Sequence, residues 1–137
     1  MSTSNRPLRI GLFSASGDIP SLIPIGEWFP LIGMTIDKSV ICVAHKMPEI
    51  REYNFRISYR QIEYKDNANE IEHPFIKECL TNNFPNINSL NISCLSSLPS
   101  GLGMGSSGAF AVAFTHLISK YFEKCQLNEY ELFRKSY

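Results

Sequence analysis

The sequence predicts an α/β (α+β) domain in which helices pack on a β-sheet. Short segments with alternating apolar and polar residues indicate strands, and two later segments have the apolar spacing of helices. A glycine-rich loop lies between the last predicted strand and the longest predicted helix. The length of 137 residues suits one domain. Because hydrophobic residues make up 44% and charged residues 19% of the chain, the composition is that of a globular protein.

The first third of the chain predicts three strands. Residues 8–14 form an apolar run that ends in small residues, followed by a turn at 14–18. Three prolines in residues 19–30 exclude a long helix there. Residues 31–36 and 39–45 then predict two short strands, with Asp37 and Lys38 as a solvated connection or a site feature.

The middle of the chain predicts a strand pair and a helix. Phe55, Ile57 and Tyr59 alternate with polar residues, which indicates a half-buried strand, and residues 61–64 can pair with it. Residues 67–74 are typical of a helix start, with a proline where its missing N–H costs nothing. His73 is interpreted as a residue of this helix start.

The last third carries the most specific pattern. Residues 89–96 alternate as a strand does, and a helix is predicted at 106–122, with Phe110, Phe114, Leu117 and Tyr121 on one face. A final helix begins near Leu127.

Charge and composition limit the classes of partner. Thirteen acidic residues balance thirteen basic residues, which argues against a general nucleic-acid binder. The longest apolar run, at 109–114, is far shorter than a membrane span, and the polar residues 1–7 do not resemble a signal peptide, so a cytoplasmic location is expected. The four cysteines are scattered and are expected to be reduced core residues: Cys42, Cys79, Cys94 and Cys125.

The loop between the last predicted strand and the long helix has the composition of a phosphate-binding site. Glycines allow left-handed backbone conformations and close approach of a ligand, and successive amides can surround an anion. The start of the next helix adds a partial positive charge. The loop lacks the Gly-Lys-Ser/Thr of a Walker A motif, and a dinucleotide fold is a minor alternative because its glycine loop should follow the first strand. The residues assigned to phosphate binding are Pro99, Gly101, Gly103, Met104, Gly105, Ser106, Ser107 and Gly108.

This loop resembles a family motif. Residues 99–109, PSGLGMGSSGA, are similar to the second motif of the GHMP kinases, P-x-x-x-G-L-G-S-S-A-A. Residues 7–10 and 17–20 resemble the opening strand and substrate loop of the family. Residues 35–38 and 70–74 resemble the D-glycero-D-manno-heptose 7-phosphate kinase branch.

The resemblance implies ATP-dependent phosphoryl transfer to a sugar or sugar phosphate. The implied fold is the mixed sheet of ribosomal protein S5 domain 2, with helices packed on it. Mg²⁺ would be held by Ser107 or Ser106, and Gly17 and Asp18 would bind the sugar. Arg9 would face the reacting phosphate as a catalytic residue, with a structural role on the first strand as the alternative.

The chain departs from the family at the sugar site and in length. Residues 14–17 and the pair Trp28-Phe29 replace glycine-rich stretches of the branch. Residues 1–137 are expected to be the N-terminal ATP-binding domain, truncated before the metal-binding glutamate, the aspartate that orients the hydroxyl and the C-terminal domain. The isolated chain is therefore expected to be inactive, and self-association through apolar surface exposed by truncation is possible. The alternatives are a non-catalytic module that binds nucleotide or sugar phosphate and an RNA-associated S5-like domain.

Overall fold

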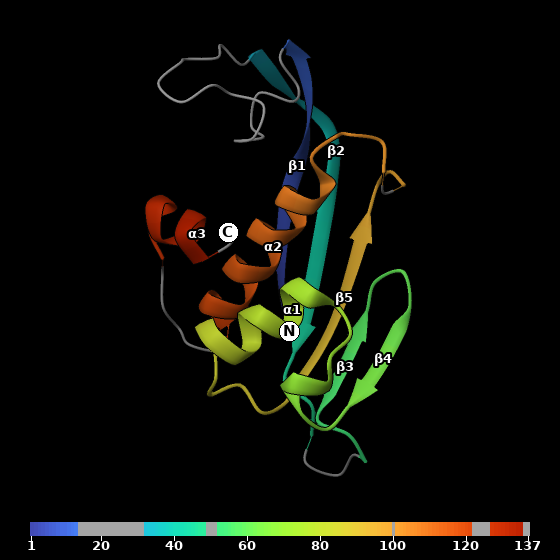
Figure 1. The fold of residues 1–137 in the computed structure, drawn as a ribbon, viewed down its shortest axis with the longest axis vertical. Helices are drawn as coiled ribbons and strands as arrows, with labels where there is room; N and C mark the ends of the chain where they lie inside the picture. Colours follow the sequence, from blue (N-terminus) through green and yellow to red (C-terminus); the bar gives the residue numbers. More distant parts are fainter. Residues whose placement is uncertain (14–31, 49–51, 100, 122–126, 136–137) are drawn as a thin grey trace.

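The computed structural model describes residues 1–13, 32–48, 52–99, 101–121 and 127–135. Their strands form one five-stranded sheet in the order β1-β2-β5-β3-β4 (Figure 1). β3 and β5 are parallel and the other neighbours are antiparallel, so the sheet is mixed, as predicted. The expected substrate loop with Gly17 and Asp18, the pair Trp28-Phe29 and Cys125 lie outside the described residues.

The two long strands of the sheet differ from the prediction. β1 spans Ser2–Phe13, so it begins six residues before the predicted start, and β2 is one strand, Ile32–His45, instead of two. The polar residues 2–6 belong to β1 because each pairs with a residue of β2, and Ser4 is buried. Backbone pairing thus extends the strand where the apolar pattern stops.

The expected break at Asp37 and Lys38 is a β-bulge. Pro7 pairs with Ser39, whereas Arg9 pairs with Thr35, so Leu8 faces three unpaired residues of β2. Proline is tolerated at this position because the N–H and carbonyl of its partner Ser39 are bonded to Ser97 and not to β1. Leu8 is fully buried, and the shift in register sets the direction of the strand at Arg9.

The remaining elements match the predicted order. β3 (Phe55–Ser58) pairs with β4 (Ile62–Lys65), and a short 3₁₀ turn (η2, Ala68–Glu70) precedes the helix α1 (Pro74–Glu78). A π-helical turn (η3, Cys79–Asn83) continues α1, and β5 covers Leu90–Ser96. The long helix α2 spans Ser106–Tyr121, and α3 spans Glu129–Lys135.

The core lies between one face of the sheet and the helices. Buried side chains alternate along β2, β3 and β5, and α2 lies against β1 and β2 with α3 beside it (Figure 1). Phe114, Leu117 and Ile118 are the large side chains that α2 buries, while Phe110 is only partly covered. Cys42 and Cys79 are buried free thiols and Cys94 is a partly buried one, in agreement with the expected reduced state.

Candidate phosphate-binding loop and aromatic cavity

The glycine-rich loop is attached to the sheet at both ends. At its start, the N–H of Ser97 donates to the carbonyl of Ser39 at 2.9 Å, and Ser97 Oγ accepts the N–H of Ser39 at 3.2 Å. At its end, the carbonyl of Met104 accepts the N–H of Arg9 at 3.2 Å. The loop therefore lies along β2 and β1 and is not a free linker.

Glycine is required where the loop meets β1. Gly101, Gly103 and Gly105 all have positive φ, with values of 91°, 69° and 64°. At Gly105 a Cβ would also lie 2.9 Å from Cγ and 3.0 Å from Nε of Arg9. The Arg9 side chain thus occupies the space that a larger residue at 105 would need, which places Arg9 directly against the loop.

The first turn of the helix that follows the loop has amides without a partner inside the helix. The first described intrahelical bond of α2 joins the N–H of Ala109 to the carbonyl of Gly105 at 3.0 Å. The N–H groups of Gly105, Ser106, Ser107 and Gly108 come before it and have no partner within the helix. Since α2 is 16 residues long, its N-terminus carries the partial positive charge of a full helix dipole.

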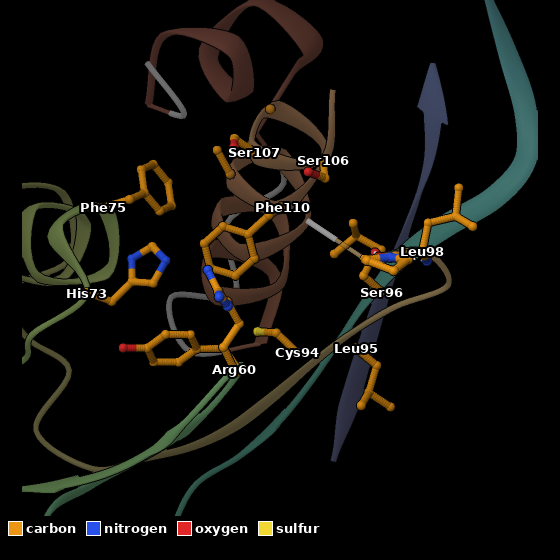
Figure 2. A pocket seen from close by; sticks show the side chains of 15 residues that line it. Arg60, His73, Phe75, Cys94, Leu95, Ser96, Leu98, Ser106, Ser107 and Phe110 are labelled. Atoms are coloured by element: carbon orange, nitrogen blue, oxygen red, sulfur yellow. Dashed lines mark hydrogen bonds between the residues drawn. The ribbon is translucent and has the colours of Figure 1, made fainter. Parts of the chain in front are cut away.

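A cavity of about 620 Å³ opens beside this helix start (Figure 2). Four of the predicted phosphate-binding residues line it: Pro99, Ser106, Ser107 and Gly108. Gly101, Gly103, Met104, Gly105 and Arg9 are not among its lining residues and lie at the loop instead. The cavity is large enough for a nucleoside and joins the phosphate-binding candidates to an apolar space.

The opposite wall of the cavity is aromatic, and the sequence did not single it out. The Phe110 ring lies 5.2 Å from His73 and 5.8 Å from Phe75, measured between centroids. Tyr59 and Arg60, from the turn between β3 and β4, complete this wall. The rings in this wall give the cavity a flat apolar surface, and the polar groups of Tyr59, Arg60 and His73 lie at its edges.

A buried carboxylate holds the β3–β4 turn in place. Glu63 is 4% exposed, and its two oxygens accept the hydroxyl of Tyr59 at 2.6 Å and the N–H of Glu72 at 2.7 Å. Burial, followed by the hydrogen bond to Glu63, raises the pKa of Tyr59 to about 12. Lys65 and Glu72 form an exposed ion pair at 3.0 Å outside this network.

His73 has the helix-start role that the sequence predicted. Its Nδ1 accepts the N–H of Ile76 at 3.4 Å, so the side chain caps α1, and Pro74 follows at the first helical position. The same ring also lines the cavity. Burial lowers the pKa of His73, while the nearby Glu63 carboxylate acts in the opposite direction.

Cys94 brings a thiol to the cavity wall. It lies directly across from Cys42 in the β2–β5 pairing, and a hydrogen bond to Cys42 and burial raise the pKa of Cys94. In the described part of the chain, no group of three or more His, Cys, Asp or Glu is arranged to hold a metal ion. No described helix is long and apolar enough to span a membrane.

Comparison with solved structures identifies the fold. The chain is similar to a D-glycero-D-manno-heptose 1-phosphate kinase from Bacteriodes thetaiotaomicron, with a TM-score of 0.78 and 18% identity over 98% of this chain and 46% of that one. A candidate sugar kinase from Campylobacter jejuni gives a TM-score of 0.71 and 17% identity, with 98% and 45% of the chains covered. Mevalonate kinase from methicillin-resistant Staphylococcus aureus gives 0.66 and 20%, with 98% and 42% covered.

The chain therefore spans less than half the length of these solved structures. A search of curated proteins by sequence found no match. The model of the GHMP kinase N-terminal domain matches residues 65–137, more than half of the chain, and includes the glycine-rich loop and α2. Together with the mixed sheet and the loop between β5 and α2, this match shows that the chain belongs to the GHMP kinase family.

Proposed function

We propose that residues 1–137 are the N-terminal, nucleotide-binding domain of a kinase that transfers phosphate from ATP to a sugar or sugar phosphate. The observation that carries this proposal is the position of the cavity, whose polar end is the start of α2 and whose other wall is aromatic. An anionic phosphate chain suits the first, and a flat nucleobase suits the second.

We assign the phosphate-binding loop and Arg9 different roles in this reaction. The amides from Gly103 to Gly108 would hold the phosphates, with Pro99, Gly101 and Met104 shaping the loop. Arg9, packed against Gly105, would place its positive charge near the transferred group. The reaction breaks the bond between the γ-phosphorus and the bridging oxygen and forms one to the acceptor oxygen, whose proton is released.

The residues present fit Mg²⁺ in part. Magnesium bound with a nucleotide takes phosphate oxygens, waters and only one or two protein oxygens. The hydroxyl of Ser107, or that of Ser106, would supply one such oxygen beside the phosphates. When bound, the ion would neutralise charge on the phosphates.

The acceptor is proposed from the family and the similar structures. Two of the three similar structures carry sugar-kinase names, and the first of them is a heptose phosphate kinase. A heptose phosphate is therefore the first acceptor to test, with Gly17 and Asp18 as the proposed sugar-binding residues. A cytoplasmic location, where ATP and sugar phosphates are present, belongs to the same proposal.

Calorimetry with MgATP tests the binding site. The wild-type chain should bind MgATP, and Ser107→Ala and Ser106→Ala should each weaken binding, with a loss of about tenfold at the residue that contacts both phosphate and metal. Ser93→Ala is the matched control, because Ser93 lies on β5 away from the cavity lining. If the wild-type chain binds neither MgATP nor magnesium tripolyphosphate at millimolar concentrations, the assignment is wrong.

Turnover distinguishes a competent enzyme from a binding module. We infer that the chain alone transfers phosphate far more slowly than the roughly 1–100 per second of ordinary kinases, because the described residues that line the cavity include no carboxylate to orient the metal or the acceptor. Coupled assays with heptose 7-phosphate and heptose 1-phosphate measure this rate. Ordinary turnover would refute the inference, and MgATP binding without transfer to any acceptor would favour the non-catalytic module.

A further inference from the structure

The His73 ring has one proton position fixed by the fold. Its Nδ1 accepts the Ile76 N–H and so carries no proton, which places the proton of the neutral ring on Nε2. Burial lowers the pKa of the ring and so favours this neutral form near neutral pH. The side chain therefore offers a single donor, the Nε2–H.

The orientation of the ring is fixed as well. Tyr59 meets it edge to face at 4.9 Å and 86°, and Phe110 meets it at 5.2 Å. Tyr59 is itself held by the hydrogen bond to the buried Glu63. Two aromatic contacts and one hydrogen bond leave the imidazole little freedom to turn.

The remaining donor faces the cavity. The two ring nitrogens point to different sides of the ring. Nδ1 is bonded to Ile76 of α1, and Figure 2 shows the other nitrogen on the side of the labelled Arg60 and Phe110 side chains. Among the described residues, none accepts a hydrogen bond from Nε2, although His73 is partly buried and lines the cavity. A half-buried donor at the edge of an aromatic wall suits a planar ring with an acceptor at its rim.

We propose that His73 is a specificity residue that donates Nε2–H to a ring nitrogen of the bound purine. The proposal rests on the proposed nucleotide site and adds to it the group that recognises the base. Phe110 and Phe75 provide the apolar surface beside the base, and His73 sets its register along that surface. A base without an acceptor at that position would leave the donor unpaired, which is how such a site discriminates.

The charged groups around the ring define how acid should act. Glu63 approaches from β4 and favours protonation, whereas burial opposes it. Arg60, from the turn between β3 and β4, lines the same cavity, and Phe110 of α2 contacts the ring. Protonation would place a second N–H on Nδ1, opposite the N–H of Ile76. Acid should therefore remove the cap of α1 at pH values below the lowered pKa of His73, while the Nε2–H donor remains.

Two substitutions separate the cap from the donor. His73→Asn keeps an acceptor near the Nδ1 position and removes Nε2, whereas His73→Gln keeps a donor near Nε2 and removes the cap. We expect H73N to melt at nearly the wild-type temperature and to bind MgATP about 5–10-fold more weakly, as expected for one lost hydrogen bond. H73Q should melt lower and retain more of the affinity.

Deaza analogues identify the contact. The 1-deaza, 3-deaza and 7-deaza forms of ATP each replace one ring nitrogen with carbon. One of them should bind the wild-type chain about 5–10-fold more weakly than ATP, and the same analogue and ATP should bind H73N equally. If every analogue loses the same factor in both proteins, His73 does not contact a ring nitrogen and the proposal is overturned.

A third measurement is independent of ligand binding. The ¹⁵N shifts of the His73 ring at neutral pH should show the proton on Nε2, and a proton on Nδ1 would overturn the proposal. Failure of the wild-type chain to bind both MgATP and tripolyphosphate would refute the nucleotide site itself. MgATP binding that is unchanged in H73N and shows no analogue coupling would refute only the role of His73.

Discussion

The contact between Gly105 and Arg9 allows two contributions to the stability loss of a Gly→Ala substitution to be separated: backbone strain and steric clash. Gly103 and Gly105 have nearly the same φ, 69° and 64°, but a Cβ at 103 would meet nothing within 4 Å. At 105 it would lie 2.9 Å from Cγ of Arg9. The two positions therefore share the backbone strain and differ in the steric clash.

The magnitudes follow from these two terms. Gly103→Ala should cost about 1–2 kcal/mol, the strain of an alanine in the left-handed region. Gly105→Ala should cost that amount plus about 1–3 kcal/mol for overpacking against the arginine stem, a total of about 2–5 kcal/mol. Gly108→Ala, with open space and no positive φ, should stabilise the chain by up to about 1 kcal/mol.

Urea unfolding of the four proteins measures these differences from the midpoints at constant slope. In an Arg9→Ala background the clash is absent, so Gly105→Ala should then cost only about as much as Gly103→Ala. Other effects of Arg9→Ala cancel in this double-mutant cycle. Equal costs for the two glycines in the wild-type background, or a coupling energy near zero, would refute the account of the loop.

Three further predictions concern the cavity and the exposed strands. Because burial and Glu63 raise the pKa of Tyr59 from 10.0 to about 12, the folded state holds this proton more tightly, and the free energy of unfolding should fall as the pH rises from about 10 to 12. Tyr59→Phe should reduce that fall in urea titrations, and a pH profile identical to that of the wild type would contradict the Glu63 contact. A hydrogen bond to Cys42 and burial raise the pKa of Cys94, so iodoacetamide should label this thiol slowly at pH 8, and more slowly with MgATP, as followed by mass spectrometry. Fast labelling that MgATP does not change would argue against a nucleotide in the cavity. Leu12 and Met34 are 51% and 52% exposed, so light scattering should show self-association that increases with protein concentration. The double variant Leu12→Lys, Met34→Lys should abolish this association, and a wild-type chain that stays monomeric at all concentrations would contradict the prediction.

Local patterns were sufficient for most elements of the fold. The alternation at Phe55 and Ile57 predicted β3, and both side chains are buried as that pattern requires. The errors lie in β1 and β2, where backbone pairing continues through polar residues and a bulge. At Asp37 and Lys38 polarity indicated a connection, but a strand can pass through a bulge with its polar side chains in solvent.

The sequence predicted the glycine-rich loop of the candidate site but not its aromatic wall. The glycine loop is contiguous in sequence and its pattern is specific, so its placement before α2 could be predicted. The aromatic wall is built by Tyr59, Arg60, His73 and Phe110, which come from three separate segments. A helix-capping histidine followed by proline gives no sign that its other edge faces a cavity, because that depends on the packing of α1 beside α2.

The strand order has a consequence for how the chain folds as it is synthesised. Among the described strands, β5 comes last in the sequence, yet it is the middle strand of the sheet and joins the β1–β2 ribbon to the β3–β4 hairpin. Each of those pairs can form early from neighbouring sequence, but neither can meet the other until Ser96 has left the ribosome. We expect nascent chains shorter than this to hold two unjoined ribbons, and assembly of the complete sheet to be the slow, non-local step.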